Sequence, residues 1–213
     1  NKTITDPVKD LSVGVYQAFG TGSGDVVNNL VSPNIVAHPK LVTEAEAGDQ
    51  RVTRKLRQLV DENGDPTTVT SRGLTTGYAF KIYPSNTSPI PIVKNEELIL
   101  LRAEARFHLG NVTGADSAES DINLIRTSWG LPAITLTTDQ AAFVTELLQQ
   151  RRYSLMFEGG HRWIDLRRLN RLTDEDRAAA GLPSLRDILT GPNAHNIDVM
   201  FPIPLAEQLA RPQ

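Results

Sequence analysis

The sequence of 213 residues contains no cysteine, which excludes disulfide bonds and thiolate catalysis. Positive charge is not in excess either, because the formal net charge is −3 and the pI is about 5.8. A nucleic-acid-binding protein needs a basic face, so we expect no nucleic acid among the partners. No run of about 18 apolar residues is present, and the sequence therefore predicts no membrane-spanning helix.

Groupings of residues that perform catalysis or hold metal ions are also missing. The four histidines, His38, His108, His161 and His195, are scattered without the paired spacing of a metal site. The glycine-rich stretch GTGSGD (20–25) lacks the Lys-Ser/Thr that follows a phosphate-binding loop, and no serine lies in a nucleophile elbow. The acidic residues fall in polar loops rather than as a pair in apolar surroundings. The sequence thus predicts no enzyme, no metal site and no cofactor.

The chain divides by composition into two regions. Residues 1–93 are rich in loops, and we expect them to complete a fold whose main body is residues 94–213. Within the first region, residues 49–60 fit either a short helix or a strand. Residues 62–66 (ENGDP) indicate a turn, and residues 77–85 alternate in the manner of a strand.

The second region opens with two expected helices that form a hairpin. Apolar side chains recur on one face of the first helix, which ends at Gly110 and Asn111. These side chains are Leu98, Leu101, Ala105 and Leu109. The second helix has helical spacing at Ala115, Ala118, Ile122 and Ile125. Small residues near the turn let two antiparallel helices approach closely, and the pair resembles one tetratricopeptide unit.

Further helices are expected after this pair. A Thr138/Asp139 cap opens the third helix. Its inward stripe is Val144, Leu147, Leu148, Arg151 and Leu155. Gly159 and Gly160 allow a sharp turn with positive φ, and a shorter helix follows at HRWIDLRRLN. These features predict a mainly α fold with tetratricopeptide-like packing, long irregular loops and little β structure.

Residues 147–169, LLQQRRYSLMFEGGHRWIDLRRL, concentrate arginines and acids around a double glycine and a tryptophan. With ELILLRAEARFHLGN before them and FPIP (201–204) after them, they resemble the C-terminal half of the SusD/RagB family. The resemblance covers residues 94–169 and 201–204 and is poor before residue 90. The matching positions are Arg151, Arg152, Leu155, Phe157, Glu158, Gly159, Arg162, Trp163, Asp165, Leu166 and Arg168.

The resemblance implies a SusD-like fold and a non-enzymatic role. Members of this family are surface lipoproteins of the Bacteroidetes outer membrane that bind glycans or other nutrients. By resemblance, the protein would bind an oligosaccharide or peptide and deliver it to a SusC-like, TonB-dependent barrel transporter. The family is considerably longer than this chain, so we expect a C-terminal portion or a strongly reduced member. Its lipid anchor would then lie outside the segment.

The motif also departs from the family pattern. Gln150 and Ser154 stand where the family usually has glutamate, so the charge network must be re-paired, which indicates a divergent member. The arginines could bind an anion, or their planar forks could pair with carboxylates and lock the last helices together. We favour the structural interpretation, in which two arginines pair with three acids. These residues are Arg151, Arg162, Glu146, Glu158 and Asp165.

Aromatic residues in loops are the candidates for ligand contact, because sugars stack their C–H faces on aromatic rings. These candidates are Trp129, Tyr78, Tyr83 and Tyr16. Trp129 could instead close the end of the second helix. Trp163 is expected to fill the core against Phe157 and Leu166, with stacking on a sugar as the alternative.

A second function stays open on the sequence. Tetratricopeptide-like helices can form an interaction scaffold that binds a partner chain and no small molecule. Exposed aromatic side chains on loops would favour nutrient binding, whereas a large apolar groove along the helix pair would favour the scaffold.

Overall fold

The structure is a computed structural model and describes residues 10–31 and 35–201. The chain forms two compact units, Asn1–Arg162 and Trp163–Gln213. Helices contain far more residues than strands, and the strands occur only as short pairs among the described residues. The expected mainly α fold with long irregular loops is therefore confirmed.

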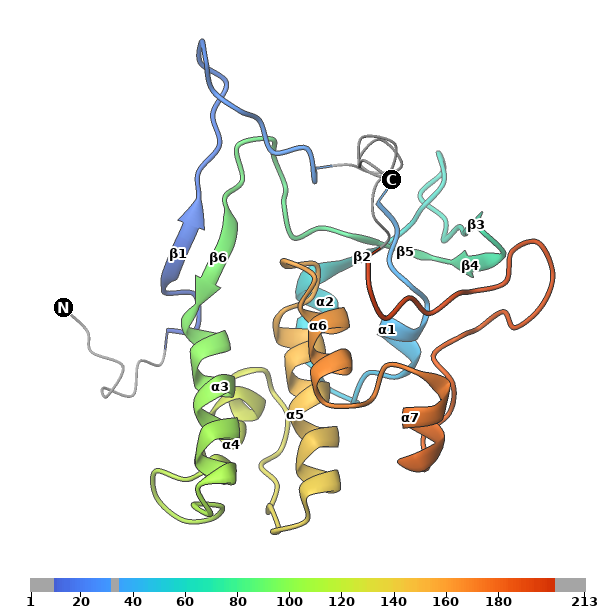
Figure 1. Ribbon diagram of the computed structural model, residues 1–213. Coiled ribbons are helices and arrows are strands. Elements are labelled where there is room, and N and C mark those ends of the chain that lie inside the picture. The colour runs from blue at the N-terminus through green and yellow to red at the C-terminus, as the bar shows by residue number, and fades with distance from the viewer. Residues whose placement is uncertain (1–9, 32–34, 202–213) are drawn as a thin grey trace, which may run out of the picture. The chain divides into compact units, whose positions relative to one another are not determined.

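Three helices form the body of the first unit (Figure 1): α3 (Asn95–His108), α4 (Ala118–Ser128) and α5 (Gln140–Ser154). Phe107 of α3 stacks on Phe143 of α5, with ring centroids 3.9 Å apart and planes 4° from parallel. The side chains buried between the three helices include Leu100, Ala103, Ile122, Ile125 and Leu147. This close packing buries most of the apolar surface of the unit and holds the helix ends in place.

The helices begin where the sequence supplies capping groups. Asp139 accepts hydrogen bonds from the backbone N–H groups of Ala141 and Ala142 and caps α5, as predicted. Ser117 and Ser120 form a reciprocal capping box at the start of α4. These caps satisfy backbone donors that have no partner within the helix.

The inward face of α3 differs from the prediction. The buried apolar residues are Ile99, Leu100, Ala103 and Phe107. Of the face predicted to be buried, Leu101 is 41% exposed and Leu109 is 84% exposed, Ala105 is exposed and Leu98 is half-buried. The helix carries apolar residues on two faces, so periodicity alone could not choose between them. Packing against α4 and α5 decided the outcome.

The other predicted stripes are largely confirmed. Ala118, Ile122 and Ile125 of α4 are buried, whereas Ala115 is exposed because it precedes the helix. The stripe of α5 is buried at every predicted position, namely Val144, Leu147, Leu148, Arg151 and Leu155.

Three antiparallel strand pairs lie outside this helical body. The pairs are β1 (Gly14–Gln17) with β6 (Ile90–Lys94), β2 (Leu56–Gln58) with β5 (Tyr78–Phe80), and β3 (Val69–Ser71) with β4 (Leu74–Thr76). Gly14 is needed for the first pair, because a Cβ there would lie 2.2 Å from the carbonyl oxygen of Val93. Strand β6 runs directly into α3 and fixes the start of that helix beside β1 (Figure 1).

Two short helices, α1 (Lys40–Thr43) and α2 (Gln50–Lys55), complete the first unit. Because β2 follows α2 without a break, residues 49–60 form both the helix and the strand that the sequence left open. The predicted turn at 62–66 is confirmed by the hydrogen bond from the Gly64 N–H to the Asp61 carbonyl. A second core around Leu56, Tyr153 and Met156 joins this region to the end of α5.

The boundary between the two units falls within α6 (His161–Arg168), and the second unit also contains α7 (Asp174–Ala179). The helix α6 occurs where the sequence predicts it. Of FPIP (201–204), only Phe201 lies within the described residues. The division at residue 93 stays a prediction. No helix in the described part of the chain is long and apolar enough to cross a membrane.

Candidate functional site

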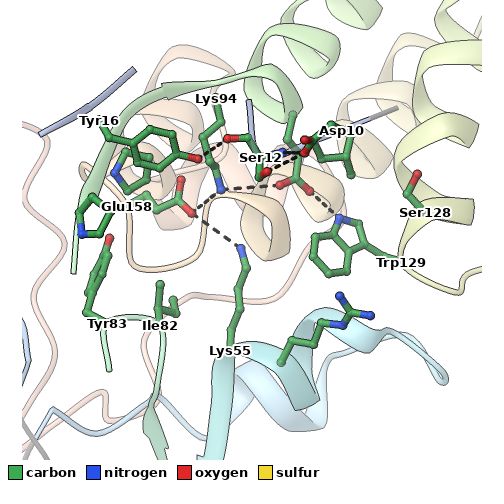
Figure 2. Close-up of a pocket in the computed structure, with 15 residues that line it drawn as sticks. Asp10, Ser12, Tyr16, Lys55, Ile82, Tyr83, Lys94, Ser128, Trp129 and Glu158 are labelled. Atoms are coloured by element: carbon green, nitrogen blue, oxygen red, sulfur yellow. Dashed lines mark hydrogen bonds and ion pairs between the residues drawn. The ribbon is translucent and has the colours of Figure 1, made fainter. Parts of the chain in front are cut away.

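A pocket of about 510 Å³ opens in the first unit (Figure 2). Its walls come from the segment around β1, the end of α2, the chain between β5 and β6, the β6–α3 junction, the end of α4 and the turn after α5. These segments are far apart in the sequence. The packing of α3, α4 and α5 brings them together, so the pocket depends on the helical body.

Three of the four aromatic residues predicted to contact a ligand lie in this pocket. Tyr16, Tyr83 and Trp129 line it, and Figure 2 shows the two tyrosines on one side and the tryptophan on the other. Tyr78 does not line it. That residue lies in β5 and packs against the core formed by Leu56, Tyr153 and Met156. Three of the proposed ligand contacts therefore share one cavity, and Tyr78 has a packing role.

Trp129 is held in a fixed orientation at the end of α4. Its indole Nε1–H donates a hydrogen bond to Glu96 Oε1 over 2.6 Å, and the Arg54 guanidinium carbon lies 5.5 Å from its ring centroid. Gly130 follows with φ of +82°, and a Cβ there would lie 2.7 Å from the Gln50 side chain. Trp129 thus both ends the helix, as one interpretation predicted, and presents a half-buried ring to the pocket.

Two lysines and two glutamates form a charged cluster at the pocket wall. Glu158 Oε1 lies 2.6 Å from Lys94 Nζ and 3.8 Å from Lys55 Nζ. Lys94 Nζ also lies 3.7 Å from Glu96 Oε2, so each acid faces at least one ammonium group (Figure 2). Burial of unpaired charge is costly, and the cluster avoids that cost by pairing every member.

Lys55 also caps the last turn of α5. Its ammonium group donates to the carbonyl oxygens of Tyr153, at 2.9 Å, and Ser154. A cation is favourable there because the final carbonyls of a helix carry partial negative charge. Burial nevertheless dominates and lowers the pKa of Lys55 to about 8, although Glu96 and Glu158 act in the opposite direction.

The two pocket tyrosines remain protonated at physiological pH. Burial raises the pKa of Tyr83 to about 12, and the nearby Glu158 carboxylate adds to this effect. Burial also raises the pKa of Tyr16, with Lys94 opposing the shift. Tyr83 donates its hydroxyl hydrogen to the Phe157 carbonyl over 3.3 Å, and Tyr16 donates to the Ser12 carbonyl. Both hydroxyl oxygens can therefore still accept a hydrogen bond from a ligand.

Two of the three acids in the predicted network, Glu146 and Glu158, contact cations outside that network. Glu158 pairs with Lys94 rather than with an arginine, and Glu146 accepts from Arg126 Nη1 over 2.8 Å. Arg151 is buried with Nη2 3.9 Å from Glu97 Oε1. Glu158 and Glu146 thus pair with cations of β6 and α4, respectively. Each cation is distant from its acid in the sequence, so no local pattern predicts these pairs.

Other motif residues act as structural groups within their own unit. Arg162 Nη1 donates to the Leu148 carbonyl over 3.3 Å, and Arg152 Nη1 lies 2.5 Å from Glu44 Oε2. In the second unit, Arg168 Nε lies 3.0 Å from Asp165 Oδ1. The double glycine has positive φ at both positions, +48° at Gly159 and +75° at position 160, which confirms the sharp turn.

Trp163 is only half-buried, which corrects the expectation of a fully enclosed core side chain. Within the second unit its indole N–H donates to the Asp198 carbonyl over 2.8 Å, and its ring lies 4.7 Å from that of Phe201. In the first unit, Phe157 stacks on Phe80 with centroids 4.3 Å apart. Phe157 and Trp163 thus have ring partners supplied by segments outside the motif.

Gln150 and Ser154, the two departures from the family pattern, both contact a buried arginine. Arg51 of α2 is fully buried and donates to Ser154 Oγ over 3.0 Å and to the Gln150 carbonyl over 3.3 Å. Asp49 supplies the balancing charge, with Oδ2 2.7 Å from Arg51 Nη2. Sequence reasoning missed Asp49, Arg51 and Lys55. An available signal was the N-capping aspartate followed by two cations four residues apart.

A second hollow, of about 450 Å³, lies in the second unit. It is lined by Thr173, Asp174, Glu175, Arg186, Asn196 and Ile197. Hydrogen bonds from Ser184 and Arg186 hold the pKa of Asp174 below its usual value. None of the described residues that line this hollow is aromatic.

The first pocket is suited to binding a polar molecule that has apolar faces. It presents three aromatic rings, two neutral phenols and a set of ammonium and carboxylate groups. Across the described residues, no three His, Cys, Asp or Glu side chains are grouped to hold a metal ion. A mainly α body with tetratricopeptide-like packing that carries such a pocket defines a class of helical binding proteins.

Comparison with known proteins narrows this class. The sequence profile of the SusD family matches residues 54–209, and the chain belongs to that family. A crystal structure of a SusD superfamily protein from Parabacteroides distasonis ATCC 8503 aligns with 82% of this chain and 40% of its own, at 19% identity and a TM-score of 0.54. The fold is therefore shared with that structure.

Two further solved structures match over shorter spans. A SusD superfamily protein from Bacteroides fragilis NCTC 9343 covers 66% of this chain at 18% identity with a TM-score of 0.47. B. fragilis NanU covers 63% at 19% identity with a TM-score of 0.43. The chain spans only 32% of each of these two proteins. No match was found among curated protein sequences.

Proposed function

We propose that this protein binds a glycan or another nutrient without chemically changing it, and that the first pocket holds the ligand. The observation that carries the proposal is the convergence of Tyr16, Tyr83 and Trp129 on one cavity beside paired charged groups. Aromatic rings bury the apolar faces of a sugar, and the flanking hydroxyl and charged groups meet its polar edges. Membership of the SusD family supports a nutrient-binding role.

Delivery to a SusC-like, TonB-dependent outer-membrane transporter is the second part of the proposal. Family membership supports it, together with a location at the cell surface through a lipid anchor outside this segment. The protein would capture the ligand from outside and release it to the barrel.

Ligand binding is tested first, by isothermal titration calorimetry against neutral oligosaccharides, acidic oligosaccharides and short peptides. Trp129→Ala removes the stacking surface and should weaken binding at least about 10-fold, since aromatic anchors at the centre of a site commonly contribute more than about 1 kcal/mol. Tyr78→Phe is the matched control, because Tyr78 lies outside the pocket, and its affinity should equal that of the parent.

Equal affinity of the parent and Trp129→Ala would place the ligand elsewhere. To exclude an effect on folding, both variants are compared with the parent by thermal unfolding. A Trp129→Ala protein that unfolds at the parent temperature and still binds equally well contradicts the pocket assignment.

Delivery is tested by purifying the protein from its native outer membrane and identifying what accompanies it by mass spectrometry. We expect a large β-barrel in near-stoichiometric amount. Recovery without a barrel would favour the second candidate, a tetratricopeptide-like protein-interaction scaffold. The observation that favours this candidate is the exposed apolar row of Leu101, Ala105 and Leu109 on α3.

A further inference from the structure

The acids and cations that line the first pocket differ in how far they are already engaged. Glu158 faces Lys94 and Lys55, and Glu96 accepts from the Trp129 indole and lies beside Lys94. Asp10, the third acid of the lining, accepts from the backbone N–H and the hydroxyl of Ser12, at 3.0 Å and 2.6 Å. All three carboxylates therefore have donors within the protein. A ligand therefore gains little affinity by donating further hydrogen bonds to these carboxylates.

Arg54 is the exception among the charged lining residues. Across residues 10–31 and 35–201, its guanidinium group has no ion pair and no hydrogen bond. Its recorded interaction is with the Trp129 ring, 5.5 Å from the guanidinium carbon to the centroid. The side chain is exposed and lines the pocket. Five N–H donors are therefore available beside the aromatic surface, in a fork that suits a carboxylate.

We propose that the ligand is an oligosaccharide that carries carboxylate groups, with one carboxylate bound by Arg54 and the adjoining sugar ring placed against Trp129. This inference rests on the proposed function, because it names the ligand class for the same pocket. The Glu96 hydrogen bond holds the indole in place, and the Arg54 guanidinium carbon lies 5.5 Å from the centroid of its ring. A sugar acid presents a flat C–H face and a carboxylate on the same ring. The C–H face can stack on Trp129 while the carboxylate binds Arg54.

The lining favours a saccharide over an acidic peptide. An extended peptide can gain affinity from backbone hydrogen bonds by adding a strand to an open sheet edge. Pro89 and Pro91 line the pocket and have no backbone N–H to donate. The hydroxyl-bearing side chains Ser12, Tyr16 and Ser128 also line it and can meet sugar hydroxyl groups.

The test uses uronic acid oligomers in matched pairs. Galacturonate, glucuronate and mannuronate trimers are each compared with their methyl esters, which keep the rings and remove the charge. Affinity is measured by calorimetry on the whole chain. Hydrogen bonds to a charged group contribute about 1.5–3 kcal/mol, so at least one acid should bind about 10- to 100-fold more tightly than its ester.

Two substitutions locate the effect. Arg54→Gln should reduce the acid-to-ester ratio to about 1, because the charged partner of the carboxylate is lost. Arg57→Gln is the matched control, because Arg57 is exposed on the neighbouring β2 and does not line the pocket, and it should retain the full ratio. Both side chains are exposed, so neither change should disturb folding.

Several results would overturn this ligand class. If no acid of the three pairs binds better than its ester, or if Arg54→Gln keeps the preference, the carboxylate does not bind Arg54. Tight binding of a neutral glycan or an acidic peptide through Trp129, with no Arg54 dependence, refutes the inference and leaves the proposed function intact. If no glycan or peptide binds in a Trp129-dependent manner, the proposed function fails as well.

Discussion

In the body formed by α3, α4 and α5, the inward-facing side chains are mostly leucine, isoleucine, alanine and phenylalanine. In the pocket of the same unit, the side chains that are buried or nearly buried include two lysines and two glutamates. Apolar packing is non-directional and tolerates modest change. A buried charged cluster tolerates little, because each group left without its partner carries the full cost of desolvation.

This difference indicates that the helical body and the pocket have separate roles. The body positions the pocket walls mainly through apolar contacts, which do not depend on pH. The pocket has a charged and aromatic surface whose geometry is fixed by specific hydrogen bonds, such as that from Trp129 to Glu96. Substitutions should therefore have different signatures in the two parts, in magnitude and in pH dependence.

The strongest contrast is expected within α3. Leu100 is fully buried and Leu101 is 41% exposed, although the two are adjacent and chemically identical. Leu100→Ala should lower the free energy of unfolding by about 2–5 kcal/mol, through lost burial and the cavity left behind. Leu101→Ala should change it by less than about 0.5 kcal/mol. Urea denaturation of both variants measures the difference, and similar losses would contradict the assigned face of α3.

Substitution of Arg126 tests whether the loss of one buried charge in the body is as destabilising as expected for the charged cluster of the pocket. Its guanidinium is buried and lies 2.6 Å from Glu46 Oε1 and 2.8 Å from Glu146 Oε1, and it also donates to the Pro132 carbonyl. Arg126→Ala should cost about 3 kcal/mol of unfolding free energy, because it leaves these groups without their partner.

Arg126→Met is the control for this effect, since methionine keeps much of the packing volume and removes the charge. It should cost less than the alanine variant if part of the loss is packing. Denaturation of Arg126→Ala within about 0.5 kcal/mol of the parent would show that the arginine is dispensable to the body.

The pocket should respond to pH through Lys55. Its pKa is lowered from 10.5 to about 8, so above pH 8 the unfolded chain binds more protons at this site than the folded chain. Stability contributed by this group must then rise with pH. From the two pKa values, the free energy of unfolding contributed by Lys55 should rise by about 2 kcal/mol between pH 8 and pH 10.

The measurement is the free energy of unfolding of the parent minus that of Lys55→Met, across this pH range. Taking the difference cancels the titration of groups common to both proteins, including the tyrosines. A difference that stays flat from pH 8 to pH 10 would mean that Lys55 titrates normally in the folded protein.

The elements of the body were predictable from the sequence because their signals are local. The Asp139 cap, the glycine stops and the stripe of α5 all lie within one helix and depend on neighbours a few residues away. The face of α3 was not predictable in this way. Both of its faces carry apolar residues, and only packing against α4 and α5 determines that Leu100 is buried and Leu101 is exposed.

The pocket was predictable in its aromatic residues and unpredictable in its charges. Trp129, Tyr16 and Tyr83 could be nominated because loop aromatics are few. The pairing of Glu158 with Lys94 spans 64 positions along the chain, and no local pattern indicates it. The motif around Glu158 was therefore sufficient to recognise the family, but it did not predict the contacts that its residues make.

The central claim, that the pocket holding Trp129 is the ligand site, is tested most directly by the two indole N–H resonances in a ¹⁵N-labelled sample. The chain has two tryptophans, and Trp163 does not line this pocket, so it serves as an internal reference. Trp163→Phe assigns the two signals. Titration with a ligand found by calorimetry should shift the Trp129 resonance in proportion to occupancy and leave the Trp163 resonance in place. A saturating ligand that leaves the Trp129 resonance unmoved would contradict the account.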